Sequence, residues 1–402
     1  MSDPTASDAT ASDPTASDPT ASDTGAASSQ PWSGLRIVER SGLCSAYATR
    51  QWAALGAEVV VLEPPEGHPY RQLAPFAPGT SAPEGSLWWA FLGQNKRSVV
   101  LEPEGDDERR LLAAADVVLG EPPPGQTLAG PAHVAQVVVS ISPFGARGPR
   151  ANWQGSDLVA WASAGLTYVT GFPDRPPVSL AAVNFAAHVT AMHAMGAAMV
   201  ALRVRRRTGR GQNIDISMQQ ANAALHPEVG VPLVLDDGVH RGRSGNRRAI
   251  SRPFGLYPCL DGFVSIVIVQ PAHWANMAGW IQEVTDMEAV ADPAFSDLAV
   301  RWEAAEFIDS LTEQLTLGAT KHDLFVEGQR RNIPVTPVNT VADLATDPHL
   351  EASGFWQPST HPVVGEHRSP GDLFRGDSSW WHWTRAPLLG EHTDDVISRW
   401  IS

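Results

Sequence analysis

Ser140-Ile-Ser-Pro-Phe-Gly-Ala-Arg-Gly-Pro opens the most informative stretch of the chain, and Arg207-Thr-Gly-Arg-Gly-Gln-Asn-Ile-Asp-Ile-Ser closes it. Between them lie a glycine-rich segment, a proline-rich loop and a long run rich in Ala and Met. This order predicts the end of a strand, a glycine turn, a short helix, a long apolar helix over 183–205 and a further strand. Glycine in the first turn lets backbone N–H groups approach a ligand beside Arg147, which suits carbonyl or phosphate oxygens.

Composition and charge narrow the class of protein. The 402 residues carry a formal net charge of −15, which argues against a nucleic-acid partner because phosphate backbones require a basic surface. Two cysteines, Cys44 and Cys259, cannot form a disulfide framework and fit a reducing compartment. No apolar run reaches the roughly 18 residues of a membrane-spanning helix, and the polar N-terminus is unlike a secretory signal. We therefore expect a cytoplasmic protein with no membrane or nucleic-acid partner.

The first 31 residues differ from the rest of the chain. Residues 2–26 repeat the unit Ser-Asp-Pro-Thr-Ala with small variations. Such a segment cannot form a core, and proline at this spacing prevents a helix. The composition predicts a disordered acidic leader over 1–31, either a solvated tail or a segment that binds a partner.

Ordered structure is expected to begin with a βαβ unit. Residues 35–39 and 57–63 have the apolar pattern of buried strands, and 47–55 has that of a helix. The unit lacks the Gly-x-Gly-x-x-Gly pattern, which excludes a nicotinamide or flavin site of the usual kind. An α/β protein with a parallel sheet is therefore predicted.

Several segments, taken in order, resemble the class III CoA-transferase family, which includes formyl-CoA transferase, carnitine CoA-transferase and acyl-CoA racemases. The matching segments include Glu63-Pro-Pro-Glu-Gly, Asn95-Lys-Arg-Ser-Val, the 140–217 stretch and Pro387-Leu-Leu-Gly-Glu-His-Thr-Asp-Asp-Val. The resemblance implies a large Rossmann-like domain with a parallel sheet, a smaller α+β domain and an interlocked dimer. It divides the chain into the leader (1–31), a large CoA-binding domain (32–225), a linker (226–250), the small domain (251–332) and a return segment (333–402).

The resemblance also implies where coenzyme A would bind. The candidate CoA-binding residues are Leu43, Cys44, Arg71, Asn95, Lys96, Arg97, Glu121, Ser142, Phe144 and Gly145. Arg71, Lys96 and Arg97 are cations suited to phosphates. Two positions depart from the family pattern, because Leu43 replaces a polar glutamine and Glu121 begins a segment where the family carries Asn-Phe-Arg. No metal is implied.

The catalytic position is the largest departure. In the family an aspartate attacks the acyl-CoA carbonyl to form a mixed anhydride, and the returning CoA thiolate forms an enzyme thioester that the acceptor acid resolves. Asn184 stands at that position, and no Asp or Glu occurs between Asp174 and Asp215. An amide cannot be this nucleophile. His188, one helical turn further on, is the other catalytic candidate, while Ser156 stands where racemases carry histidine.

Three functions remain open. The chain is a CoA-transferase subunit whose partner supplies the aspartate, an acyl-CoA enzyme with another nucleophile, or a non-catalytic acyl-CoA-binding or scaffold protein. In each, the ligands are an acyl-CoA and a carboxylic acid, and the assembly is a homodimer or a heterodimer with a related chain.

Overall fold

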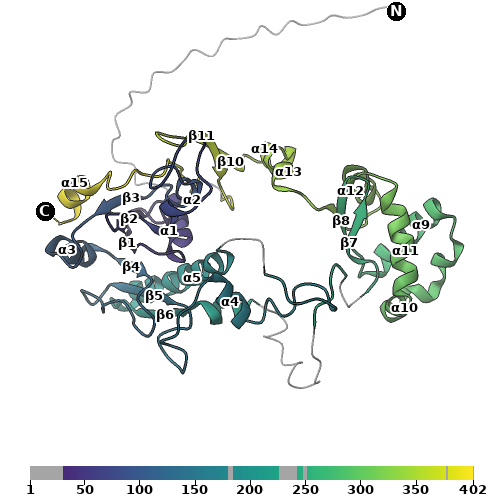
Figure 1. Cartoon of the computed structure of the whole chain (residues 1–402), viewed down its shortest axis with the longest axis horizontal. Coiled ribbons are helices and arrows are strands. Elements are labelled where there is room, and N and C mark those ends of the chain that lie inside the picture. The colour runs from purple at the N-terminus through teal and green to yellow at the C-terminus, as the bar shows by residue number, and fades with distance from the viewer. Residues whose placement is uncertain (1–29, 180–183, 226–241, 248–250, 377–378, 402) are drawn as a thin grey trace, which may run out of the picture.

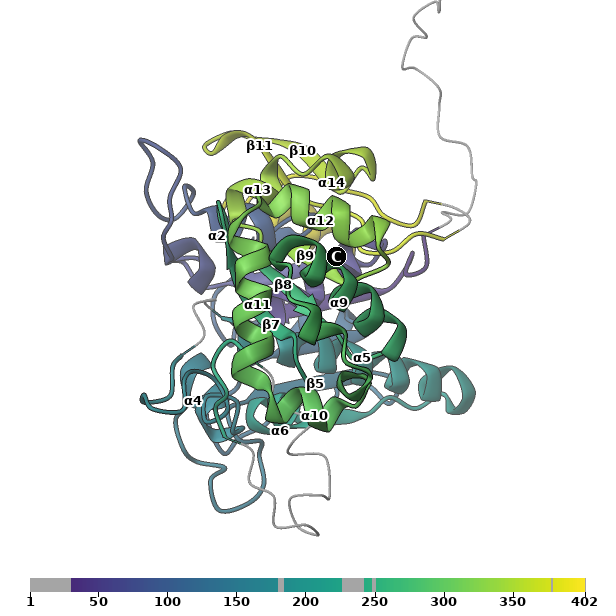
Figure 2. The same ribbon diagram turned by 90° about the vertical axis from the view of Figure 1, so that its right-hand side faces the viewer.

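The computed structural model describes residues 30–179, 184–225, 242–247, 251–376 and 379–401. Residues 1–29 of the predicted leader and most of the predicted linker lie outside these residues. Figures 1 and 2 show a large α/β unit and a smaller α+β unit beside it. The chain leaves the large unit, builds the small one and then returns to the large unit, where its C-terminus lies.

A parallel sheet forms the centre of the large unit. Its strands lie in the order β3 (Arg97–Val100), β2 (Glu58–Glu63), β1 (Arg36–Arg40), β4 (Val117–Gly120), β5 (Val137–Ser142) and β6 (Asn213–Ser217). Every neighbouring pair is parallel. Because the chain runs outward in both directions from the β1–β4 pair, the order reverses there, as in doubly wound nucleotide-binding sheets. The predicted Rossmann-like fold is confirmed.

Helices cover both faces of this sheet. They are α1 (Ser45–Ala54), α2 (Leu87–Leu92), α3 (Asp106–Ala114), α4 (Asp157–Ser163), α5 (Phe185–Thr208) and α6 (Met218–Ala224), with a 3-10 turn η1 (Pro69–Gln72). On one face Trp52 of α1 and the alanines of α5 pack on Ile37 and Val139. On the other face α3 and the C-terminal Trp400 pack on Val38. Burial on both faces explains why the strands read as continuous Val/Ile/Leu runs.

Helix α5 is the one described helix that is long and apolar enough to cross a membrane. Half of its most apolar window is buried inside the protein. Its alanines 186, 187, 191, 194 and 198 face the same core as Trp52. It is therefore a core helix of the large unit, and its apolar composition reflects that packing.

The small unit is an antiparallel sheet covered by helices. Strands β7 (Phe254–Cys259), β8 (Gly262–Val267) and β9 (Val335–Pro337) pair in that order, under α9 (Pro271–Thr285), α10 (Leu298–Glu303), α11 (Ala305–Leu317) and α12 (Lys321–Arg330). Short 3-10 turns η2 (Glu288–Ala291) and η3 (Pro293–Ser296) follow α9. Leu260-Asp261 forms the turn between β7 and β8. Strand β9 lies beyond the expected domain boundary at 332, because its main-chain pairing with β8 completes this sheet.

The return segment contains α13 (Val341–Ala345), α14 (Pro348–Ala352), the hairpin β10 (Trp356–His361) and β11 (Gly365–Pro370), α15 (Thr393–Val396) and a final π-helical turn η4 (Ile397–Ile401). It is fastened to the large unit by polar contacts. The Arg50 guanidinium donates to the Pro370 carbonyl at 2.7 Å, and the Trp89 indole donates to the Pro387 carbonyl at 2.9 Å. These contacts join residues about 300 positions apart in the sequence.

We predict that Trp52→Ala lowers the free energy of unfolding by about 3–5 kcal/mol, because Trp52 is fully buried between the sheet and α5 and its removal leaves a cavity. Urea unfolding followed by circular dichroism measures the loss. The matched control is Trp153→Ala, at a tryptophan that is 57% exposed, which should change the value by less than about 1 kcal/mol. Equal losses for both variants would contradict this packing.

Candidate active site

Two adjoining hollows lie at the carboxyl ends of the central strands. The inner pocket, of about 370 Å³, is lined by the turn after β1, the loop after β4, the end of β5 and the starts of α4, α5 and α6. The outer groove, of about 720 Å³, lies among the turns that follow β1, β2, β3 and β4. Glu121 and the two prolines after it line both. Both hollows lie at the reversal of strand order, where open α/β sheets bind ligands.

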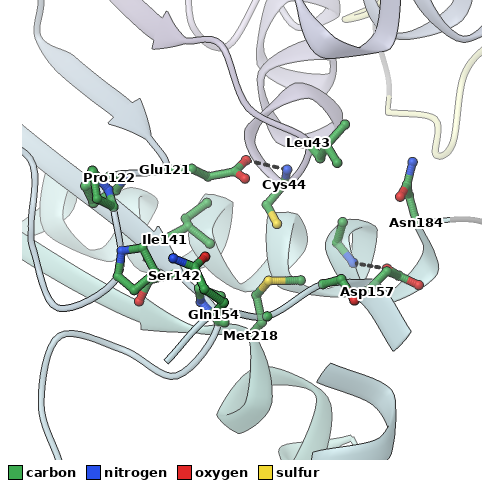
Figure 3. A pocket seen from close by; sticks show the side chains of 16 residues that line it. Leu43, Cys44, Glu121, Pro122, Ile141, Ser142, Gln154, Asp157, Asn184 and Met218 are labelled. Atoms are coloured by element: carbon green, nitrogen blue, oxygen red, sulfur yellow. Dashed lines mark hydrogen bonds between the residues drawn. The ribbon is translucent and has the colours of Figure 1, made fainter. Parts of the chain in front are cut away.

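Glu121 follows β4 and extends its carboxylate to the start of α1 (Figure 3). Its Oε1 atom accepts hydrogen bonds from the backbone N–H groups of Cys44 at 2.5 Å and Ser45 at 3.2 Å. Gly42 permits this approach, since a Cβ there would lie 2.3 Å from Oε1. Helix α1 has no side-chain cap of its own, so Glu121 supplies one from another element. Burial raises the pKa of Glu121 to about 7, against the lowering effect of these donors.

The start of α5 is capped by Asp157, not by Asn184. Asp157 Oδ1 accepts the Ala187 N–H at 3.0 Å; burial raises its pKa while the backbone donors oppose that rise. Asn184 precedes the helix with φ 57°, a left-handed conformation that asparagine tolerates. Its Nδ2 atom lies near the Tyr70 hydroxyl but is buried without a well-aligned hydrogen bond among the described residues. Asn184 thus offers an unused donor at the inner pocket.

Ser142 and Cys44 complete the polar wall. Ser142 ends β5, is 4% exposed and has a hydroxyl without a hydrogen-bond partner among the described residues. Burial raises the pKa of the Cys44 thiol well above its usual range, and the charges of Glu121 and Asp157 raise it further. The thiol therefore stays protonated and is a poor nucleophile. The pocket combines two spare donors, Ser142 Oγ and Asn184 Nδ2, with two carboxylates that serve as helix caps.

A family model described as CoA-transferase family III matches residues 32–393. The chain belongs to CoA-transferase family III. The chemistry of this family is the transfer of CoA between an acyl-CoA thioester and a carboxylic acid, as the resemblance predicted.

Similar proteins of known sequence and structure agree with this membership. The chain is 30% identical, over 92% of its length and 94% of the other protein, to succinyl-CoA:(R)-benzylsuccinate CoA-transferase subunit BbsE of Thauera aromatica. It is 28% identical, over 92% and 94%, to succinyl-CoA–D-citramalate CoA-transferase of Chloroflexus aurantiacus. A CAIB/BAIF family protein from Brucella suis superposes with a TM-score of 0.80 at 25% identity, over 92% of this chain and 99% of that one.

The structure brings five of the predicted site residues of this CoA-transferase family member to the inner pocket. They are Leu43, Cys44, Glu121, Ser142 and Asn184. They come from four separate segments of the chain. Three of these segments follow or end β1, β4 and β5, whose carboxyl ends meet at one edge of the sheet, and the fourth is the start of α5. The other predicted residues lie elsewhere.

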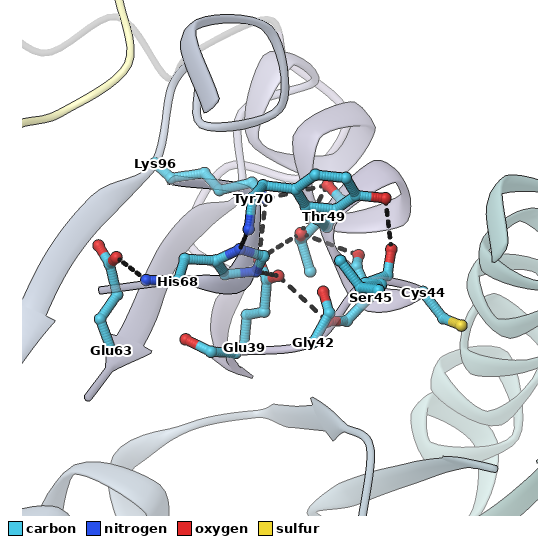
Figure 4. A network of polar contacts seen from close by, with 12 residues as sticks. Glu39, Gly42, Cys44, Ser45, Thr49, Glu63, His68, Tyr70 and Lys96 are labelled. Carbon is cyan, nitrogen blue, oxygen red and sulfur yellow. Dashed lines mark hydrogen bonds and ion pairs between the residues drawn. The ribbon is translucent and has the colours of Figure 1, made fainter. Parts of the chain in front are cut away.

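Lys96 and Arg71, expected to bind phosphates, are instead buried in ion pairs. Figure 4 shows Lys96 reaching the polar network around Glu39. Lys96 Nζ lies 2.8 Å from Glu39 Oε2 and donates to the Ala46 carbonyl at 2.9 Å. Arg71 binds Glu63 through Nε at 2.7 Å and Nη2 at 3.0 Å. Both side chains are wholly inaccessible, so neither presents its charge to a ligand.

Asn95 and Arg97 also lie away from the two hollows. Arg97 begins β3, whereas the groove lies at the carboxyl end of the sheet. Its guanidinium pairs with Asp395 at 2.7 Å, and Asn95 binds the backbone of the return segment at Thr384. Arg97 begins a strand that the sequence analysis did not expect, and the sheet order places this strand at the edge.

The remaining predicted residues lie near the inner pocket without lining it. Phe144 is buried against Trp153, and Gly145 takes φ 80° in the turn after β5. His188 stacks on Tyr47 with ring centroids 4.7 Å apart, and burial lowers its pKa to about 4. A neutral, stacked imidazole fits packing better than proton transfer at the pocket.

Sequence reasoning passed over Gln154 and Met218, which line the inner pocket, and Tyr70, whose hydroxyl donates to the Leu43 carbonyl at 3.0 Å. Nothing local marks these residues, because each reaches the site from a different part of the chain: Gln154 from a loop, Met218 from the start of α6 and Tyr70 from η1. Gly42 did carry a signal, as a glycine directly after a buried strand marks a close approach. No group of three side chains suited to a metal ion occurs within the described part of the chain.

We predict that Lys96→Met lowers the free energy of unfolding by about 3–5 kcal/mol. The change leaves the Glu39 carboxylate buried without its cation, and uncompensated buried charges are costly. Arg97→Met on the next position of the chain is the matched control. Its ion pairs are partly exposed, so the loss should stay below about 1 kcal/mol in the same urea titration.

The Glu121 carboxyl should make stability depend on pH. Its pKa is raised from 4.5 to about 7 in the folded chain, so between these values the folded state holds a proton that the unfolded state has lost. Stability from this group is therefore present below pH 4.5 and lost as pH rises through 7. Glu121→Gln keeps the acceptor and removes the titration. Melting temperatures from pH 5 to 8 should show the mutant gaining on the wild type as pH rises; parallel curves would contradict the shift.

Proposed function

We propose that this chain is one subunit of a heteromeric CoA-transferase, in which a related partner chain supplies the catalytic aspartate. The reaction moves CoA from an acyl-CoA thioester to a carboxylic acid. The observation that carries the proposal is the composition of the inner pocket: Asn184 offers an amide, while Glu121 and Asp157 are held by backbone N–H groups.

The geometry of the inner pocket supports a nucleophile supplied by the partner chain. A carboxylate nucleophile must be free to approach the thioester carbonyl, and a carboxylate that caps a helix would have to abandon its donors first. Cys44 is held as a thiol and His188 lies outside the pocket. The spare donors Ser142 Oγ and Asn184 Nδ2 remain able to bind a carbonyl oxygen.

Relatives support the heteromeric assembly. The Thauera aromatica protein is named as a subunit, and a Chloroflexus aurantiacus relative, 26% identical over 91% of this chain, is named as the alpha subunit of succinyl-CoA–L-malate CoA-transferase. The exposed face of α5, which carries Phe185, Met192, Met199 and Val200, is an apolar surface that a partner subunit would cover. An interlocked dimer in the cytoplasm is the assembly we propose.

The reaction would then proceed in four covalent steps at the partner's aspartate. Its carboxylate attacks the thioester carbonyl and expels the CoA thiolate, which leaves a mixed anhydride. The thiolate attacks the enzyme side of the anhydride, releases the first acid and forms an enzyme thioester. The acceptor carboxylate repeats the sequence in reverse and leaves as the new acyl-CoA.

Asn184→Asp tests the proposal directly. Loss of a nucleophile that acts within a unit costs on the order of a millionfold, so the isolated wild-type chain should transfer CoA negligibly. The variant restores a carboxylate of nearly the same shape and should form a hydroxylamine-sensitive acyl adduct when given an acyl-CoA. Mass spectrometry of the intact protein detects the adduct.

The matched control is Asn222→Asp, a buried asparagine on α6 that does not line the inner pocket and should form no adduct. Co-purification with a family member that carries the aspartate should restore turnover to the wild-type chain. Robust turnover by the purified wild-type chain alone would overturn the heteromer proposal and direct attention to Glu121 and Asp157.

A further inference from the structure

The outer groove is acidic. Its lining includes Glu63, Glu66, Glu104, Glu108 and Glu121, and Arg40 is the one Lys or Arg among the described residues that line it. Arg40 is already paired with Glu108 at 2.9 Å, and Glu63 is neutralised by Arg71. Glu66, Glu104 and Glu121 form no ion pair among the described residues. An anion entering the groove therefore meets like charge.

Glu121 also occupies the best anion-binding position near the groove. The N-terminus of the ten-residue helix α1 directs backbone N–H groups toward the hollows, and such groups attract phosphate or carboxylate oxygens. Here the Glu121 carboxylate already accepts from Cys44 and Ser45. Gly42 leaves room for the Glu121 side chain and for nothing larger than hydrogen at that point.

The inner pocket, by contrast, is prepared for a neutral polar group. Ser142 and Asn184 both line this pocket and are more than nine-tenths buried. Ser142 Oγ has no hydrogen-bond partner among the described residues, and Asn184 Nδ2, near the Tyr70 hydroxyl, has no well-aligned one. Buried donors of this kind normally have an acceptor, and a thioester or amide carbonyl would provide one. The remaining wall is apolar, with Leu43, Ile141 and Met218.

We propose that Glu121 determines the ligand specificity of this chain: it fills the anion position at α1, so the site accepts an uncharged acyl thioester and disfavours one that carries the phosphates of coenzyme A. The inference rests on the proposed function in taking an acyl thioester as the ligand. It goes further in assigning the CoA nucleotide to the partner subunit's site rather than to the groove of this chain.

The test compares two probes that share the thioester arm and differ in the phosphate-bearing nucleotide, acetyl-CoA and S-acetyl-pantetheine. Calorimetry on the full-length chain at pH 8.5, where Glu121 is ionised, gives both dissociation constants. The wild type should bind S-acetyl-pantetheine at least as tightly as acetyl-CoA. Glu121→Gln, which keeps the hydrogen-bond acceptor and removes the charge, should tighten acetyl-CoA at least tenfold and leave S-acetyl-pantetheine within twofold.

Glu104→Gln is the matched control, because it removes one charge from the same groove at a residue with no contact to α1. It should change the ratio of the two constants less than threefold. Three results would each overturn the inference: a wild type that prefers acetyl-CoA tenfold, an unchanged ratio in Glu121→Gln, or an equal gain in Glu104→Gln. The inference would also be overturned if neither probe bound to the wild type or to Glu121→Gln. Turnover with an aspartate-bearing partner is measured separately. If that heteromer is active and Glu121→Gln leaves the ratio of the two dissociation constants unchanged, this inference is wrong and the proposed function still holds.

Discussion

The Glu39 carboxylate is buried at the end of β1, and the protein must neutralise it from within. Burial alone would raise its pKa, but Lys96 and His68 outweigh burial and lower the pKa to about 2. The same carboxylate accepts from the hydroxyls of Ser45 at 3.1 Å and Thr49 at 2.6 Å. One buried charge thus joins β1, β3 and α1, and thereby fixes the turn from which both hollows are built.

Carboxylates take a second role at the site itself. Glu121 and Asp157 satisfy the N-terminal backbone groups of α1 and α5, which their own sequences leave without side-chain caps. Helix starts near a ligand site commonly attract the anionic part of the ligand. Because this chain fills both positions with its own side chains, its site is electrostatically unlike one made to receive phosphates.

The tryptophan-rich C-terminal segment packs against the large unit of its own chain. Trp380, Trp381 and Trp383 form a cluster of the kind that is common at interfaces. In the structure Trp381 and Trp383 stack with centroids 5.6 Å apart, and Trp381 is buried in the core beside Trp52. The segment therefore closes the large unit within one chain. The apolar residues Phe185, Met192, Met199 and Val200 of α5 remain exposed.

The sequence by itself determined the family and the parallel sheet. These follow from local patterns: buried strands of Val and Ile, glycine at turns, and motifs in a fixed order. Only the tertiary structure showed the partners of the charged side chains. From the sequence, Lys96 and Arg71 were predicted to bind phosphates, whereas in the structure they pair with Glu39 and Glu63. The structure also showed that Glu121, which the sequence analysis treated as a departure from the family pattern, accepts hydrogen bonds from the start of α1. The physical reason is that the energy of a charge depends on its neighbours and its burial, and sequence spacing specifies neither for residues that meet across a sheet.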